Sequence, residues 1–324
     1  GDQGLSKRDF SRIIKPLNLF GVKTKSKKNR LPLKITGTDF LRPIEYDELR
    51  GSAQVKSCLL FCALNTPGIT KIRAAPSRDH TERLFKFLNI PIKIRREKKF
   101  DIIKIRGENQ YNGFDYKIPG DISSSAFFIV LTLLSKNSKI LIKNVNVNKS
   151  RTGIIDILKK MNANIRLINK KTYNGEDIAD IFVKSGKSLK SINCAKEMNS
   201  RAIDEFLLIF LVCAKAKGIS YFNNIGELRN KECDRLKFSS NFLKMIGIKV
   251  KETSNSLKIY GNPRLELNGN YEIKNYIKDH RVCMMSCIAA LVLGGTWKIY
   301  ESDSINTSFP KFFSKLKSLG AIIN

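Results

Sequence analysis

The chain has 324 residues, 42% of them hydrophobic, which is enough for two domains with sizeable cores and argues against wholesale disorder. No apolar run reaches the roughly 18 residues that suggest a membrane-spanning helix, so we expect no membrane segment. The formal net charge of +30 fits two classes of partner, nucleic acid and small anionic substrates.

The basic charge by itself does not choose between these partners. The densest basic run is Lys23–Arg30, and it contains no aromatic residue on which a base could stack. The other lysines are spread along the whole chain, as on an ordinary basic surface. We therefore favour small anions and expect no nucleic-acid partner, while a basic nucleic-acid-binding module stays open as the alternative.

The cysteines indicate a reducing compartment. There are seven, none forms a Cys-x-x-Cys motif, and the pairs Cys58/Cys62 and Cys283/Cys287 are each one helical turn apart in apolar segments. This spacing is typical of buried free thiols, so we expect a cytoplasmic protein. The only two histidines are far apart in the sequence, so no zinc site is expected.

One local pattern recurs along the chain: an amphipathic helix, then Gly or Asn, then a β-branched stretch. Gly and Asn tolerate the left-handed conformation that closes a helix C-terminus, so each copy is expected to fold as helix, cap and strand. Five copies follow one another at roughly 70-residue spacing, with caps at Gly21, Asn89, Asn162, Gly247 and Gly320. The odd number suggests a sixth copy ahead of Gly1.

A Pro-Gly pair at residues 119–120 marks the expected domain boundary. It precedes a strong helix start, where Asp121 or a serine of Ser123–Ser125 can cap the apolar helix Ala126–Leu134. We therefore expect a first domain at residues 1–117 with two repeats and a second domain at residues 118–324 with three.

Three polar motifs of the first domain are expected to precede helices. GDQGLSKR ends in Arg8, which would project from a helix start, where the backbone dipole favours anions. GSAQVK leaves backbone amides open to an oxyanion, and Ser52 and Gln54 add side-chain donors. RDHTE begins with Arg78, whose guanidinium could bind a phosphate. The simpler alternatives are a surface arginine, an N-cap serine and a capping segment.

The second domain contains an acidic residue at the start of a very apolar helix. In NSRAIDEF, Asp204 lies two residues ahead of the apolar run Phe206–Ala214. A carboxylate at such a border can be desolvated enough to suit proton transfer. An N-terminal cap of the helix is the structural alternative.

The densest charged segment is ELRNKECDR at residues 227–235. Lys231 and Arg235 are four residues apart and would share one helix face, with Glu232 beside them. Two cations and a carboxylate could hold a phosphorylated substrate and move a proton, although such a run can also be a solvated helix face. Further on, Asp279–Arg281 precedes the apolar helix Val282–Leu293, and several helix N-termini aimed at one place would make a strong anion site.

Taken in order, these motifs resemble EPSP synthase, the 3-phosphoshikimate 1-carboxyvinyltransferase of the shikimate pathway. The match covers essentially the whole chain through GDQxLSKR, SAQVK, SRDHTE, PGDISSSAFF, RTGI, IDEF, ELRxKExDR, DHR and SFP. SAQVK and RDHTE resemble the class often called type II. The family also has a segment ahead of the GD motif, which is not present here.

The resemblance implies a two-domain inside-out α/β barrel of repeated βαβαββ-type units. Two units would lie in the first domain and three in the second, with one unit missing at the N-terminus. We therefore expect an N-terminally truncated chain that is inactive by itself.

The resemblance also implies the reaction and its residues. The enolpyruvyl group of phosphoenolpyruvate would move to the 5-hydroxyl of shikimate 3-phosphate, through a tetrahedral intermediate and with release of phosphate. Asp204 would be the base, and proton transfer would be assisted by Lys231 and Glu232. Shikimate 3-phosphate would bind Ser52, Ala53, Gln54, Arg78, Asp204 and Lys231. Phosphoenolpyruvate would bind Arg8, Gln54, Arg235 and Arg281. No metal ion or organic cofactor is implied, and we expect a monomer.

Overall fold

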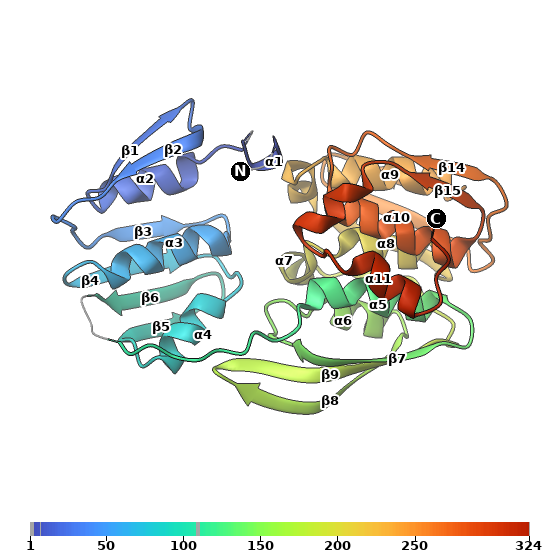
Figure 1. Cartoon of the computed structure of the whole chain (residues 1–324), viewed down its shortest axis with the longest axis horizontal. Helices are drawn as coiled ribbons and strands as arrows, with labels where there is room; N and C mark the ends of the chain where they lie inside the picture. The colour runs from blue at the N-terminus through green and yellow to red at the C-terminus, as the bar shows by residue number, and fades with distance from the viewer. Residues whose placement is uncertain (1–2, 7, 108–110, 324) are drawn as a thin grey trace. The chain divides into compact units, whose positions relative to one another are not determined.

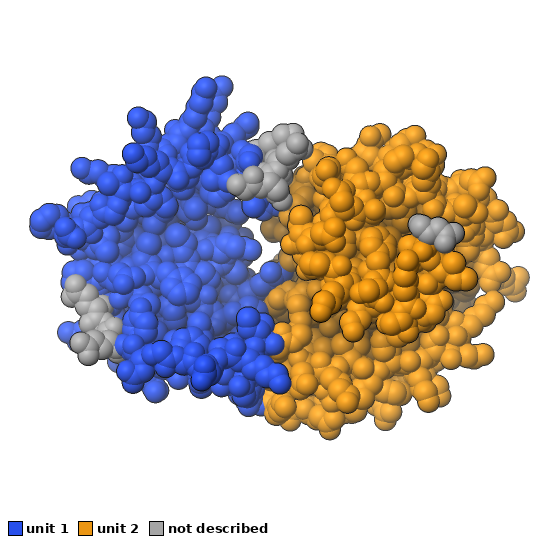
Figure 2. All heavy atoms as spheres, viewed as in Figure 1, with its two compact units in different colours: residues 1–118, 172–176 blue, residues 119–171, 177–324 orange. Residues whose placement is uncertain are grey.

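The computed structural model describes residues 3–6, 8–107 and 111–323, and the chain divides into two compact units (Figures 1 and 2). Unit 1 comprises residues 1–118 and 172–176, and unit 2 comprises residues 119–171 and 177–324. Residues 172–176, which the sequence analysis assigned to the second domain, thus belong to unit 1. They form the tip of a hairpin, where Glu176 Oε1 lies 2.6 Å from Nδ1 of His80.

Unit 1 is built on a four-stranded sheet in the order β3-β4-β6-β5 (Figure 1). β3 (Glu45–Glu48) runs parallel to β4 (Ile69–Ala74), and β6 (Asp101–Arg106) is antiparallel to both β4 and β5 (Ile92–Arg96). Every second residue of β4 and β6 is buried, because the period of two turns those side chains toward α3. The other elements are α1 (Gln3–Ser6), α2 (Ser11–Leu19), β1 (Lys23–Lys27), β2 (Arg30–Thr36), α3 (Ala53–Leu64) and α4 (His80–Phe87).

Unit 2 is organised around three apolar helices that pack on one another: α5 (Ile122–Leu134), α8 (Phe206–Ala214) and α10 (His280–Leu293) (Figure 1). Every residue of α8 is buried, so its position in the core is fixed on all sides. α5 contacts β7 (Lys139–Asn146), α8 contacts β13 (Ser256–Gly261) and α10 contacts β15 (Thr296–Ile299).

The strands of unit 2 form three sheets, ordered β7-β9-β8, β10-β11-β13-β12 and β14-β15. The remaining helices and strands of the unit are α6 (Gly153–Lys160), β8 (Asn164–Tyr173), β9 (Glu176–Lys184), β10 (Asn193–Cys194), α7 (Asn199–Ala202), β11 (Gly218–Asn223), α9 (Arg235–Met245), β12 (Val250–Glu252), β14 (Asn270–Ile273) and α11 (Phe312–Ser318), with 3-10 helices η1 (Lys196–Met198), η2 (Gly226–Asn230) and η3 (Ser302–Thr307).

Polar residues cap the starts of three buried helices, as the sequence suggested. Ser52 Oγ accepts from the Val55 amide at α3, and Asp121 Oδ2 accepts from the Ser124 amide at α5. Asp279 caps α10 by accepting from the backbone amides that follow it. These bonds satisfy helix donors that have no partner within the helix.

The five helix caps expected from the sequence are confirmed. All five residues have positive φ, between 56° and 100°, at Gly21, Asn89, Asn162, Gly247 and Gly320. In the first four copies the expected strand follows, as β1, β5, β8 and β12. The fifth expectation is wrong over the described residues: α11 ends at Ser318, and residues 321–323 are not in a strand.

Gly247→Ala should lower the free energy of unfolding by about 1–2 kcal/mol. An added Cβ would meet nothing within 4 Å, so the cost comes from the left-handed backbone, at φ 80°. Gly37 is a matched control, because its Cβ would also meet nothing within 4 Å and its φ lies outside the positive range. Gly37→Ala should be neutral or slightly stabilising. Urea denaturation compares the two variants, and equal losses would contradict the assignment.

All seven cysteines lie in the described part of the chain and are free. Five are buried, whereas Cys58 and Cys62 are only half-buried, so the expectation of burial is wrong for this pair. Over the described residues, no helix combines the length and the apolarity needed to cross a membrane.

Candidate active site

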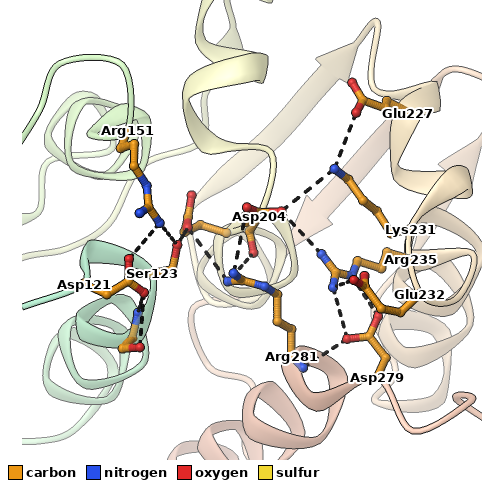
Figure 3. Close-up of polar contacts among 12 residues, drawn as sticks. Asp121, Ser123, Arg151, Asp204, Glu227, Lys231, Glu232, Arg235, Asp279 and Arg281 are labelled. Carbon is orange, nitrogen blue, oxygen red and sulfur yellow. Dashed lines mark hydrogen bonds and ion pairs between the residues drawn. The ribbon is translucent and has the colours of Figure 1, made fainter. Parts of the chain in front are cut away.

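Asp204 of unit 2 is surrounded by three cations (Figure 3). Its Oδ1 lies 3.9 Å from Lys231 Nζ and 3.7 Å from Arg235 Nη1, and its Oδ2 lies 3.8 Å from Arg281 Nη2. Asp204 lies directly before the N-cap residue of α8, Arg235 is the first residue of α9 and Arg281 is the second residue of α10. Three segments distant in the sequence therefore meet at one carboxylate.

Arg235 is fixed by a buried ion pair. Its Nε donates to Asp279 Oδ2 at 2.8 Å and its Nη2 donates to Glu232 Oε2 at 2.7 Å, while the side chains of Arg235 and Asp279 are 2% and 0% exposed. Burial opposes the charge of both partners, but each stabilises the other. As a result the pKa of Arg235 is raised and the pKa of Asp279 is lowered. The guanidinium is thus a permanent, oriented cation.

The segment that carries Lys231 does not form the single helix expected from the sequence. η2 ends at Asn230, and α9 begins only at Arg235, because Asp234 caps it by accepting from the Lys237 amide at 2.8 Å. Lys231 and Arg235 therefore do not share a helix face, and that prediction is wrong. The two cations converge on Asp204 all the same, and Lys231 Nζ also lies 3.4 Å from Glu227 Oε1.

A second polar cluster lies on the other side of Asp204. Arg281 Nη1 donates to the backbone oxygen of Asp204 at 3.3 Å and lies 4.0 Å from Glu205 Oε1. The Ser123 hydroxyl donates to Glu205, and Arg151 Nη2 donates to Ser123 Oγ at 2.7 Å. The cluster joins the N-terminal ends of α5, α8 and α10.

Burial and charge act in opposite directions on the carboxylates of this cluster. Burial raises the pKa of Glu205, against the influence of Arg281 and Ser123. Burial would also raise the pKa of Asp121, but Arg151, at 2.8 Å, and the helix-capping bonds hold it below its usual value. Asp121 is thus held as an anion beside Arg151.

This arrangement suits an anionic substrate that must lose a proton. Arg235 and Arg281 lie at the N-termini of long helices, so the backbone dipoles add to their charge. The N-cap residue of α8 is Glu205 rather than Asp204, so the capping alternative for Asp204 does not hold. A carboxylate next to three cations can accept a proton from a bound hydroxyl. Over residues 3–6, 8–107 and 111–323, no group of three or more His, Cys, Asp or Glu side chains is placed to hold a metal ion.

Four of the site residues named in unit 1, Ser52, Ala53, Gln54 and Arg78, lie at two helix starts. Ser52 caps α3, and Ala53 and Gln54 are the first two residues of that helix. Arg78 lies two residues ahead of α4 and is half-buried. The carboxylate of Asp79, the N-cap residue of α4, makes no cap bond but pairs with arginines of α4 and β5.

A buried ion pair joins these two helix starts. Lys56 Nζ of α3 lies 2.6 Å from Glu82 Oε1 of α4, with side chains 0% and 4% exposed. The sequence neighbours of this pair, Ser57 and Thr81, have hydroxyls 2.7 Å apart. Because both contacts lie near the starts of α3 and α4, they fix the position of Ser52–Gln54 relative to the segment of Arg78.

Arg8 lies between α1 and α2 rather than at a helix start, so that expectation is wrong. Its amide donates to Leu5 O at 3.0 Å, and α2 begins only at Ser11. Residues 1, 2 and 7 of the GDQGLSKR motif lie outside the described residues.

Four charged residues of these networks had no role in the sequence analysis: Arg151, Glu205, Lys56 and Glu82. Each lies inside a motif that carried the family resemblance, namely RTGI, IDEF, SAQVK and RDHTE. The available signal was a charged residue within or beside an apolar helix, where it needs a partner when buried.

Comparisons with known proteins agree with the motifs. The family model of EPSP synthase (3-phosphoshikimate 1-carboxyvinyltransferase) matches residues 1–316. The 3-phosphoshikimate 1-carboxyvinyltransferases of Petrotoga mobilis and Ruthia magnifica are each 39% identical to the chain, over 98% and 100% of its length and 74% and 73% of theirs.

A solved structure agrees in fold. The EPSP synthase of Acinetobacter baumannii superposes with a TM-score of 0.86 at 34% identity, covering 98% of this chain and 72% of its own. This confirms the expected α/β fold, and the comparisons give no support to a nucleic-acid-binding module. On the family match and these identities, the chain belongs to the EPSP synthase family of transferases.

Proposed function

We propose that the protein transfers the enolpyruvyl group of phosphoenolpyruvate to the 5-hydroxyl of shikimate 3-phosphate. The 5-oxygen of shikimate 3-phosphate would lose its proton and bond to C2 of phosphoenolpyruvate, while the methylene carbon of phosphoenolpyruvate gains a proton. The tetrahedral intermediate would then lose phosphate and a methyl proton to give the enol ether. The observation that carries this proposal is the carboxylate of Asp204 within 4 Å of three cations, two of which, Arg235 and Arg281, lie at helix N-termini.

The proposed roles in unit 2 follow from charge and position. Asp204 accepts the hydroxyl proton and binds shikimate hydroxyls, and Lys231 and Glu232 assist proton transfer at the oxygen and the methylene carbon. Arg235 and Arg281 bind the anionic groups of phosphoenolpyruvate. Glu232 accepts a hydrogen bond from Arg235 at 2.7 Å, so the proposed acid–base carboxylate is next to an arginine proposed to bind phosphoenolpyruvate.

The proposed roles in unit 1 concern substrate binding. Ser52, Ala53, Gln54 and Arg78 bind shikimate 3-phosphate, which suits a helix N-terminus with open amides and an arginine fork. Gln54 and Arg8 also contact phosphoenolpyruvate.

We also propose a location and an assembly state. Seven free thiols suit a reducing cytoplasm. A monomeric state, a reaction without metal ion or organic cofactor, and the absence of a nucleic-acid partner stay predictions.

Asp204→Asn should lower kcat by about 100-fold or more, because the amide cannot take up the proton. The assay measures phosphate released from phosphoenolpyruvate plus shikimate 3-phosphate by protein expressed from its complete coding sequence. Asp156→Asn is the control, since Asp156 is 40% exposed and pairs with Arg201 on α7. No phosphate release by the unmutated protein would refute the function, and full activity of Asp204→Asn would refute the role of the base.

A further inference from the structure

A buried polar chain ends at Arg281. Glu205 is 3% exposed and Ser123 is 2% exposed. The Ser123 hydroxyl receives a hydrogen bond from Arg151 and donates one to Glu205, and Glu205 Oε1 lies 4.0 Å from Arg281 Nη1. Burying a carboxylate costs free energy unless charged partners and hydrogen bonds compensate for it. The partners of Glu205 therefore indicate what the buried side chain does.

The cations around Asp204 share a pattern that suggests a role for Glu205. Each one has a further acidic partner: Arg235 has Asp279 and Glu232, Lys231 has Glu227, and Arg281 has Glu205. Each cation is thus shared between Asp204 and a further carboxylate, and all three lie 3.7 to 3.9 Å from the oxygens of Asp204.

Glu205 is buried, so an effect on substrate binding would have to pass through Arg281, the cation beside it. The Glu205 side chain is 3% exposed, and Ser123 takes up the oxygen that faces Arg281. Asp204 Oδ2 lies 3.8 Å from Nη2 and Glu205 Oε1 lies 4.0 Å from Nη1, so without the charge of Glu205 the attraction of Arg281 to Asp204 would be less opposed. The guanidinium would then move toward Asp204 and away from the phosphoenolpyruvate that it is proposed to bind.

We propose that Glu205, held by Ser123, is a positioning residue that orients the Arg281 guanidinium for phosphoenolpyruvate and keeps it from closing further on Asp204. This inference rests on the proposed function, because it takes Arg281 as a ligand of phosphoenolpyruvate. It assigns no contact between Glu205 and either substrate.

Glu205→Gln tests the proposal, because glutamine keeps the size and an acceptor for Ser123 but lacks the charge. In the enzyme expressed from its complete coding sequence, KM for phosphoenolpyruvate should rise on the order of tenfold. KM for shikimate 3-phosphate should stay within about twofold, and the melting temperature should be unchanged or higher because a buried charge is removed. Asp180→Asn is the control: Asp180 is a buried carboxylate that accepts hydrogen bonds from Asn144 N and Asn169 Nδ2, and its change should leave both KM values unchanged.

Two further variants keep the test decisive. Glu205→Asp restores the charge and should bring KM for phosphoenolpyruvate closer to the unmutated value than Glu205→Gln does. Ser123→Ala keeps the charge but frees the carboxylate, and it should raise the same KM by a smaller factor. An unchanged KM for phosphoenolpyruvate in both Glu205→Gln and Ser123→Ala would overturn the positioning role while leaving the transferase function intact. Absence of turnover in the unmutated enzyme would instead count against the function itself.

Discussion

Asp279→Asn should lower the free energy of unfolding by about 3–5 kcal/mol, the usual cost of breaking a buried ion pair from one side. Arg235, at 2% exposure, would lose its buried ionic partner and keep only Glu232 and the more distant Asp204. The amide would also present a donor group to the guanidinium, so the loss is not repaired by the shape of asparagine. The single tryptophan, Trp297, lies in unit 2 on β15, and its fluorescence during urea denaturation reports on this unit.

Asp234→Asn is the matched control for this variant. Asp234 also caps a helix and also pairs with an arginine, Arg229 at 2.8 Å, but its side chain is 40% exposed. Asparagine is as good a helix cap as aspartate, and an exposed pair contributes about 0–1 kcal/mol. Similar losses in the two variants would show that burial does not set the strength of the Asp279 pair.

The same pair predicts the dependence of stability on pH. Arg235 holds the pKa of Asp279 below its ordinary value, despite burial. A lowered folded-state pKa contributes stability that is present above the unfolded value of about 3.9 and lost as the pH falls through the folded value. The stability difference between the unmutated protein and Asp279→Asn should therefore be constant near neutral pH and shrink below about pH 4.

Lys56→Met should cost a similar amount, about 3–5 kcal/mol, because it leaves Glu82 buried at 4% exposure without its cation. Replacing both partners, as Lys56→Met with Glu82→Leu, should recover most of the loss, since neither charge then has to be desolvated. Hydrogen exchange of the α3 and α4 amides measures the effect in unit 1, and a double-mutant cycle isolates the coupling between the two side chains.

Lys71→Met is the control for the pair in unit 1. Lys71 Nζ lies 2.5 Å from Glu45 Oε1, but the side chains are 45% and 73% exposed. Water and salt screen such a pair, so the expected loss is at most about 1 kcal/mol. Additive losses in the Lys56/Glu82 cycle would mean that the buried contact carries no coupling, contrary to the geometry.

Local features of the fold were predictable because they depend on a few neighbouring residues. The caps at Asn162 and Gly247 follow from which residues tolerate a left-handed backbone, whatever the rest of the chain does. The starts of α5 and α10 follow from an aspartate ahead of an apolar run. The expectation that residues four apart share a helix face failed for Lys231 and Arg235, because Asp234 caps a new helix between them.

By itself the sequence determined the family, the α/β class and the residues of the charged motifs, because residue identity and short-range backbone preference are encoded locally. The tertiary structure alone decided which charges pair. Arg235 and Asp279 are 44 residues apart, and Ser123 and Glu205 are 82 apart. Their contacts exist because α5, α8 and α10 pack on one another and α9 packs on α8, which brings their N-terminal ends together. Burial then strengthens the interaction between the charges that meet there.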